Sequence, residues 1–179
     1  MSDDARTPLA KRIYDTAHIT GDFTLRSGAK STEYFDKYLF EADPKLLKDI
    51  AEAMVSLIPP GIDALAGLEM GGIPIATMLS QLTGLPVLFV RKKAKDYGTC
   101  KIAEGGQVRG RKLLIVEDVV TSGGAILDAA KALRAEGADL AHVVCVIDRE
   151  SGGAANLANA ALILSPLFTM SELKRAGSA

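Results

Sequence analysis

Two adjacent acids, Glu117 and Asp118, mark the change from an apolar run to small and hydroxylated residues. The run 113–117 has the aliphatic and β-branched composition of a buried strand. The stretch after the acids reads Val119, Val120, Thr121, Ser122, Gly123, Gly124 and Ala125. A helix is predicted next, because one helical face carries Ile126, Ala129, Ala130 and Leu133. A strand, a glycine-containing loop and a helix N-terminus in this order suit a phosphate.

Two kinds of group meet in this stretch, and they suit different parts of one ligand. Glycines let a phosphate approach the backbone N–H groups, and the hydroxyls of Thr121 and Ser122 add donors. Glu117 and Asp118 would repel that phosphate, so they need another partner, such as sugar hydroxyls. A sugar phosphate satisfies both requirements. The alternative is an ordinary strand–loop–helix joint with helix-capping acids. The stretch matches neither the P-loop pattern nor the dinucleotide fingerprint.

Other groups with possible chemistry follow other predicted strands. The glycine pair before the helix that begins near Pro74 is either a second anion cradle or a packing device. An arginine ends one strand, and an acid–arginine pair follows another. These groups are Gly71 and Gly72, Arg91, and Asp148 with Arg149.

A basic connection, residues 92–110, is the longest polar segment in the chain. It contains Lys92, Lys93, Lys95 and Lys101 and has glycines at 98, 105 and 106, with few residues able to anchor it. Long loops inside compact domains are often functional lids, and this one would suit a polyanion such as diphosphate. A solvated charged hairpin is the alternative.

The N-terminal hood, about residues 8–40, is predicted to contain a helix over 8–20 and then a hairpin. The hairpin concentrates cations and aromatic rings in a short space: Arg26, Tyr34, Phe35 and Lys37. It either covers a ligand or closes one end of the core.

The elements that position these groups alternate strand and helix. The sequence therefore predicts an α/β fold with a mainly parallel, twisted sheet and helices on both faces, in a single domain over 1–179. Ligands of such sheets bind at the carboxyl ends of the strands, where the candidate groups gather. The expected strands are 64–67, 87–91, 113–117, 142–147 and 161–164. Helix starts are expected at Asp43-Pro44 and at the Thr169–Glu172 capping box.

Composition limits the function classes. The chain has 179 residues, is 48% hydrophobic and 24% charged, and carries a formal charge of −1. This balance disfavours a nucleic-acid binder held by overall electrostatics. No run approaches the roughly 18 apolar residues of a membrane span. Two cysteines, Cys100 and Cys145, have no metal spacing, so a reduced, cytoplasmic protein is expected.

The run VEDVVTSGG (116–124) resembles the phosphoribosyl diphosphate signature of the type I phosphoribosyltransferases. In that family the two acids hold the ribose hydroxyls and the loop wraps the 5-phosphate. The resemblance assigns the first role to Glu117 and Asp118. It assigns the second to the segment Val119, Val120, Thr121, Ser122, Gly123, Gly124 and Ala125. Asp118 is then also a catalytic residue.

Three further segments resemble the orotate-specific branch of the family: FTLRSGAKSTEYFD (23–36), RKKAKDYGTC (91–100) and IDRESGG (147–153). The resemblance implies an Mg²⁺-dependent transfer of ribose 5-phosphate from 5-phosphoribosyl 1-diphosphate to N1 of orotate, giving orotidine 5-monophosphate for UMP synthesis. The resemblance assigns binding of the diphosphate of 5-phosphoribosyl 1-diphosphate (the donor) to Arg91, Lys92, Lys95, Tyr97, Gly71 and Gly72. It also implies that Lys95 is a catalytic residue. The resemblance assigns binding of orotate to Thr121, Arg149, Arg26, Tyr34 and Phe35. The metal is expected to bind mainly through the donor and water. A homodimer with shared sites is expected, without nucleic acid or membrane.

The chain departs from the family pattern at several positions. Tyr97 stands where histidine is usual, and Gly72 stands where some members carry a diphosphate-binding lysine. Arg26 replaces lysine, and the two are not interchangeable at a geometrically demanding site.

Two other functions compete with orotate transfer. One is a phosphoribosyltransferase for a purine or uracil, which Arg149 and the Arg26 segment disfavour. The other is a non-catalytic sensor of the same donor. A sensor would be expected to add a DNA-binding domain or a basic face, and it would not need the lysine-rich loop.

Overall fold

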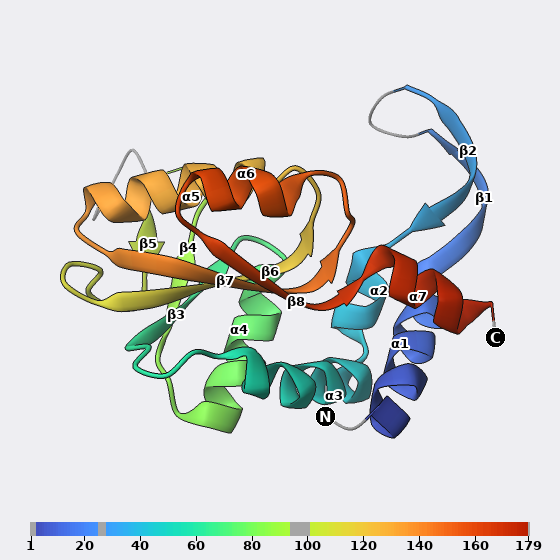
Figure 1. Ribbon diagram of the computed structural model, residues 1–179, viewed down its shortest axis with the longest axis horizontal. Coiled ribbons are helices and arrows are strands. Elements are labelled where there is room, and N and C mark those ends of the chain that lie inside the picture. Colours follow the sequence, from blue (N-terminus) through green and yellow to red (C-terminus); the bar gives the residue numbers. More distant parts are fainter. Residues whose placement is uncertain (1–2, 25–27, 94–100, 179) are drawn as a thin grey trace.

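A computed structural model describes residues 3–24, 28–93 and 101–178, and a six-stranded sheet lies at its centre (Figure 1). The strand order within these residues is β5-β4-β3-β6-β7-β8. The strands are β3 (Ala64–Leu68), β4 (Val87–Val90), β5 (Ala103–Glu104), β6 (Lys112–Val120), β7 (Asp139–Asp148) and β8 (Ile163–Thr169). All neighbours pair in parallel except the antiparallel pair β4–β5. The predicted mainly parallel α/β sheet is confirmed.

Helices cover both faces of the sheet (Figure 1). One layer contains α5 (Gly124–Ala135) and α6 (Gly153–Asn159). The opposite layer contains α3 (Pro44–Met54) and α4 (Gly72–Thr83), with the 3-10 turn Val55–Leu57 after α3. The remaining helices, at the β8 end in Figure 1, are α1 (Asp3–Ala17), α2 (Lys37–Ala42) and α7 (Met170–Gly177).

Two hydrophobic cores, one on each face, follow from alternation along the strands. In β6, Leu114 and Val116 pack in the core with α1, α3, α4 and α7. Leu113 and Ile115 pack in the other core, under α5. Successive side chains of a strand point to opposite faces, so a run buried on both sides reads as continuously apolar.

The hood is built from α1, the hairpin and α2. The strands β1 (His18–Thr24) and β2 (Lys30–Phe35) pair antiparallel in a sheet of their own, as predicted. In Figure 1 this hairpin projects away from the body of the molecule. The predicted helix 8–20 is wrong over 18–20, because His18 pairs with Phe35 as the first residue of β1.

Several boundaries differ from the sequence-based prediction. The last strand is 163–169 and not 161–164, and the short helix α6 was missed. The segment 101–110 is not a free loop, because β5 pairs with β4 and the side chains of Ile102, Ala103 and Val108 are buried. Both predicted helix starts are confirmed: Asp43 Oδ1 accepts from Lys45 N and Leu46 N, and Thr169 forms the capping box with Glu172.

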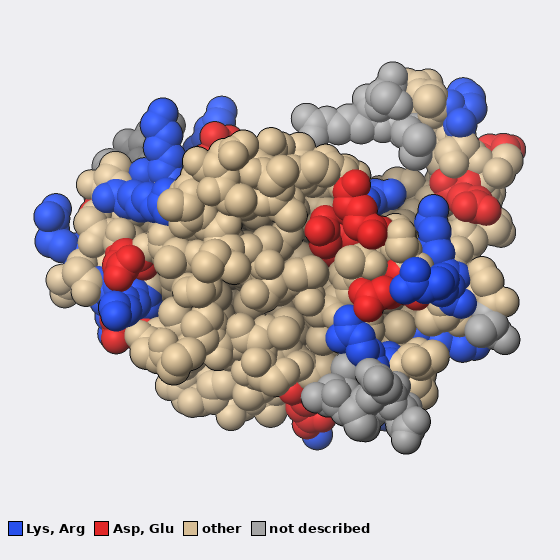
Figure 2. Space-filling model, viewed as in Figure 1, with Lys and Arg blue, Asp and Glu red and all other residues tan. Residues whose placement is uncertain are grey.

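One face of the molecule carries few charges at its middle. Figure 2 shows Lys, Arg, Asp and Glu side chains mainly toward the edges of this view. The segment 153–169, which contains α6 and β8, has no charged residue. No helix in the described ranges is long and apolar enough to cross a membrane.

The close approach of α4 to β6 generates a stability prediction. A Cβ at Gly72 would lie 2.2 Å from the backbone oxygen of Val116, so Gly72→Ala requires a backbone shift. We expect this variant to lower the free energy of unfolding by about 1–3 kcal/mol, measured by denaturant titration.

The matched control is Gly124→Ala. A Cβ there would meet nothing nearer than Ser122 Oγ at 3.8 Å. This change should leave the free energy of unfolding unaltered or raise it by up to about 1 kcal/mol through helix propensity. Equal destabilisation by both variants would contradict the packing argument.

Candidate functional site

The phosphate loop, Val120 to Gly124, connects β6 to α5. Gly123 has a φ of 78° and forms the N-cap of α5, a left-handed conformation that glycine adopts without strain. Asn156 of α6 supports the loop, because its Nδ2 donates to Ser122 O at 3.0 Å. Thr121, Ser122 and Gly124 remain exposed. The loop therefore presents hydroxyls and a helix N-terminus to solvent, as the sequence predicted.

A cavity of about 580 Å³ opens beside this loop. Its walls include part of the basic segment after β4, one of the two acids and the loop residues that follow the acids in the signature run. The predicted site residues in its lining are Arg91, Lys92, Glu117, Val119, Val120, Thr121, Ser122, Gly123, Gly124 and Ala125. Cations, a carboxylate and a phosphate loop thus share one cavity.

The two acids lie inside β6, not after it, and are both buried. Glu117 is 8% exposed and Asp118 is 0% exposed. Burial and then the charge of Asp118 raise the pKa of Glu117 above its usual range. Glu117 Oε1 accepts from Asp118 N at 3.0 Å, and Asp118 Oδ1 accepts from Val119 N at 2.5 Å. Glu117 lines the cavity, whereas Asp118 contacts α2.

Asp118 belongs to a charged cluster that the sequence did not predict. Its Oδ2 forms an ion pair with Nζ of Lys37, the first residue of α2. Glu41, one helical turn later, is also buried against it. Lys37 stands in the hood segment rich in cations and aromatics, but spacing along the chain gives no sign that its partner lies 81 residues later.

The glycine pair Gly71-Gly72 packs against β6 on the side of Asp118. A Cβ at Gly71 would lie 1.6 Å from Asp118 Oδ2, and one at Gly72 would meet Val116 O. Neither glycine is among the residues that line the cavity at the phosphate loop. Close packing on β6 therefore accounts for both glycines. The preceding peptide bond, Glu69-Met70, is cis.

The basic segment is anchored at the end of β4. Arg91 N donates to Ile102 O at 2.9 Å, so the chain returns to the sheet beside the strand that it left. Lys92 N donates to Glu69 Oε1 at 2.7 Å. Arg91 Nε also lies 4.0 Å from Glu104 Oε1. These contacts hold Arg91 and Lys92 at the rim of the cavity. Lys95 and Tyr97 lie outside the described residues.

The loop after β7 places Arg149 beside the phosphate loop. Arg149 N donates to Val120 O at 2.9 Å, and the side chain of Arg149 is exposed. Glu150 has a φ of 57°, a left-handed conformation that is uncommon outside glycine. Two hydrogen bonds fix this turn: Glu150 N donates to Asp148 Oδ1, and Ser171 N donates to Glu150 Oε2, each at 2.9 Å.

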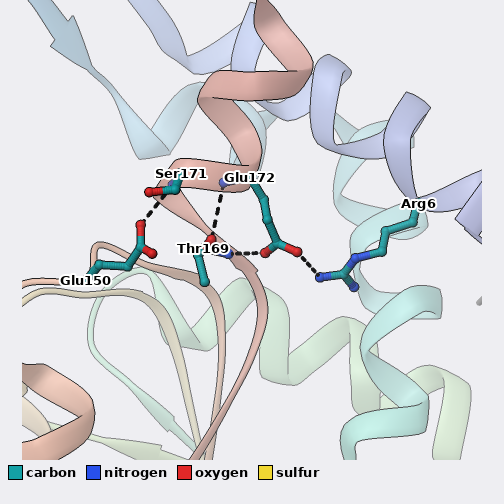
Figure 3. A network of polar contacts seen from close by, with 5 residues as sticks. All are labelled: Arg6, Glu150, Thr169, Ser171 and Glu172. Carbon is teal, nitrogen blue, oxygen red and sulfur yellow. Dashed lines mark hydrogen bonds and ion pairs between the residues drawn. The ribbon is translucent and has the colours of Figure 1, made fainter.

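The second of these bonds belongs to a network that Figure 3 shows at the start of α7. Glu172 Oε2 accepts from Thr169 N at 2.7 Å, and Glu172 Oε1 pairs with Arg6 of α1 at 3.0 Å. Arg6 also lies over the ring of Phe168. The turn that carries Arg149 is thus tied through α7 to the N-terminal helix.

The aromatic pair of the hood divides between two environments. Tyr34 is exposed and packs on Phe23 within the hairpin, with ring centroids 5.4 Å apart. Phe35 packs toward Tyr14 of α1 at 6.5 Å and against the core. Arg26 lies outside the described residues. Of the aromatic pair Tyr34 and Phe35, only Tyr34 is therefore exposed to solvent.

Comparisons with known proteins agree with this architecture. Residues 40–168 match the phosphoribosyl transferase domain family. An orotate phosphoribosyltransferase of Nocardioides sp. is 57% identical over 171 residues, which cover 96% of each chain.

The chain belongs to the orotate phosphoribosyltransferase family. Its structure is similar to that of the Mycobacterium tuberculosis H37Rv orotate phosphoribosyltransferase in complex with Fe(III) dicitrate, with a TM-score of 0.86 and 28% identity over 94% of this chain and 98% of that one. The complex of the M. tuberculosis enzyme with 5-phospho-α-D-ribosyl 1-diphosphate gives a TM-score of 0.81 at 25% identity, over 95% and 99%. The type I phosphoribosyltransferase fold and enzyme class predicted from the sequence are confirmed.

The network at α7 predicts a pH-dependent contribution to stability. Burial would raise the pKa of Glu172, but the bond from Thr169 N and the charge of Arg6 outweigh it and hold the pKa below its usual range. The stabilisation is therefore complete above the unfolded pKa of roughly 4.3 and is lost as pH falls through the lower folded pKa.

Glu172→Gln should lower the free energy of unfolding at pH 7 by about 0.5–1 kcal/mol, since the side chains of the pair are about a third exposed and screened by solvent. Denaturant titrations from pH 7 to pH 3 should show this difference shrinking toward zero. Glu52→Gln, in an exposed pair with Lys48 on α3, is the control. A difference independent of pH would contradict the assigned role.

Proposed function

We propose that this enzyme transfers ribose 5-phosphate from 5-phosphoribosyl 1-diphosphate (the donor) to N1 of orotate, giving orotidine 5-monophosphate and diphosphate for UMP synthesis. The observation that carries the proposal is the cavity in which Arg91, Lys92, Glu117 and the phosphate loop meet. The loop suits the donor's 5-phosphate and Glu117 suits a ribose hydroxyl. Arg91 and Lys92 stand at the rim for the diphosphate.

The proposed chemistry depends on positioning and electrostatics. Nitrogen N1 of orotate replaces diphosphate at C1 of the ribose, so positive charge develops on the sugar and negative charge on the leaving group. Buried carboxylates stabilise the first and the basic segment stabilises the second. By sequence resemblance, Lys95 is assigned to stabilise the departing diphosphate and Tyr97 to contact it. No covalent nucleophile is required.

Mg²⁺ is proposed to enter with the donor and to share the diphosphate charge. No group of three or more His, Cys, Asp or Glu side chains in the described ranges is placed to hold a metal ion. Phosphate oxygens and water are therefore the proposed ligands. This arrangement suits Mg²⁺, which keeps several waters and binds substrate phosphates.

Orotate selectivity is assigned to the edge of the cavity beside Arg149. The backbone N–H of Arg149 bonds to Val120 O beside the phosphate loop, and its exposed guanidinium is able to form a paired charged hydrogen bond with a carboxylate. Thr121 is proposed to contact the same base. Arg26, Tyr34 and Phe35 are proposed to cover the substrates, although Phe35 packs toward the core in this conformation.

We also propose a cytoplasmic homodimer in which the basic loop serves the neighbouring subunit. A nucleic-acid-binding regulator fits less well. Basic side chains form no continuous surface on the face shown in Figure 2, and the net charge is −1.

An activity assay tests the proposal directly. Enzyme mixed with the donor, orotate and Mg²⁺ should consume orotate's ultraviolet absorbance, and chelation of Mg²⁺ should slow the reaction strongly. Adenine and uracil in place of orotate are the controls. Activity with either of these bases but not with orotate would refute the assignment.

Arg149→Gln tests the proposed acceptor site. Loss of a charged hydrogen bond to the carboxylate should raise the KM for orotate by about tenfold or more, with little change in the KM for the donor. Steady-state kinetics with each substrate varied measure the two effects separately.

The control is Lys131→Gln, an exposed cation on α5 that does not line the cavity. This change should leave both KM values unaltered. An equal rise in both KM values for Arg149→Gln would show that Arg149 does not select orotate.

A further inference from the structure

One face of α2 delivers two ionisable side chains to Asp118. Lys37 and Glu41 are spaced i, i+4, so they lie one above the other on the helix. Lys37 Nζ contacts Asp118 Oδ2. The side chain of Lys37 is 33% exposed and that of Asp118 is 1% exposed, so Lys37 is the member of the pair that faces solvent.

Gly71 leaves the space in which Glu41 and Asp118 approach each other. Glu41 Oε1 and Asp118 Oδ2 both lie within 3 Å of the point where a Cβ at Gly71 would stand. Two ionised carboxylates at this separation in a buried site would repel strongly. One of them must therefore carry a proton, and Lys37 favours the ionised form of its partner Asp118.

The ionisation states follow from the neighbours of each group. Burial, then the hydrogen bond and charge of Asp118, raise the pKa of Glu41 to about 9. Glu41 also faces Lys37 on its own helix and Glu117 on β6, while Gly71 offers no charge. Burial opposes the charge of Lys37, but the contact with Asp118 outweighs it and raises the pKa of Lys37. At neutral pH the cluster therefore holds a charged Lys37 and a protonated Glu41 against Asp118.

Helix electrostatics do not explain why lysine occupies this position. The N-terminus of a helix carries partial positive charge and disfavours a cation in the first turn. Asp36 caps α2 because its Oδ1 accepts a hydrogen bond from Tyr38 N, and this bond does not involve the Lys37 ammonium. The partner that stabilises Lys37 is Asp118, on the strand that carries the phosphate loop.

We propose that Lys37 and Glu41 are positioning residues that hold the Asp118 carboxylate for the ribose of the donor. This inference rests on the proposed function and on the family resemblance, which assigns Asp118 to a ribose hydroxyl of the donor. Oδ1 is held by Val119 N and Oδ2 by the Lys37 ammonium, while the protonated carboxyl of Glu41 lies beside Asp118. Because the Asp118 side chain is 1% exposed and that of Lys37 is 33% exposed, Lys37 stands between this carboxylate and solvent.

Lys37→Met removes the charge and keeps the length of the side chain. It should raise the dissociation constant of the donor, measured by calorimetry, and its KM by at least about tenfold, because a charge-assisted contact to Asp118 is lost. The KM for orotate should stay within about twofold of wild type.

Glu41→Gln mimics the protonated acid at every pH. The wild-type kcat/KM for the donor should fall as pH rises through about 9, when Glu41 ionises beside Asp118. The variant should keep wild-type kinetics at pH 7 and lose this fall, whereas Glu41→Leu, which has no donor, should behave like Lys37→Met.

The control pair is Lys48 and Glu52 of α3, also spaced i, i+4 but exposed, with Nζ and Oε1 3.6 Å apart. Lys48→Met and Glu52→Gln should leave donor affinity and the pH profile unaltered. Thermal unfolding shows whether each variant is folded.

Wild-type donor affinity in Lys37→Met, or an unchanged alkaline fall in Glu41→Gln, would overturn the proposal. If Lys37→Met does not fold, the pH profile of Glu41→Gln decides alone. Donor binding is measured without orotate, so it is independent of the transfer reaction. If the wild-type enzyme binds the donor but does not consume orotate, the proposed function is refuted. The donor affinities of the variants still decide this inference.

Discussion

The burial of Asp118 at the carboxyl end of β6 is the constraint on which the rest of the site depends. An isolated carboxylate in this position would be costly, and removing one partner of a buried ion pair is strongly destabilising. The structure offsets the charge with Lys37 and places a second acid, Glu41, against it. Gly71 must then lack a side chain, because any Cβ there would overlap the Asp118 carboxylate.

Strand alternation explains how adjacent acids serve two sides of the site. Glu117 and Asp118 are neighbours in β6, so their side chains leave opposite faces of the sheet. Glu117 lines the cavity with the phosphate loop, and Asp118 meets α2 and the turn before α4. A ligand that bound both acids would bridge the carboxyl edge of the strand, the usual ligand position in parallel sheets.

The parts of this arrangement that depend on local sequence were predictable. The strand–loop–helix at 113–127, the hairpin, the cap at Asp43 and the capping box at Thr169 each rest on neighbouring residues. The pairing of Lys37 with Asp118 was not predictable, since neither residue type nor spacing identifies a partner so distant in the chain. The extent of β6 was also underestimated, because two acids at a strand end resemble the start of a loop. The buried position of both side chains shows instead that the strand continues to Val120.

The hood also contacts the sheet next to the candidate site. The family match begins at residue 40, yet Lys37 lies before that point and contacts the acid at the end of β6. At the other side, Arg6 of α1 pairs with Glu172, whose helix holds the turn that carries Arg149 (Figure 3). The two ends of the chain thus meet the sheet at the positions assigned to donor and acceptor. Because each contact joins a charged side chain to a residue on or beside the sheet, a displacement of α2 would disturb Asp118, and a displacement of α1 would disturb the turn that carries Arg149.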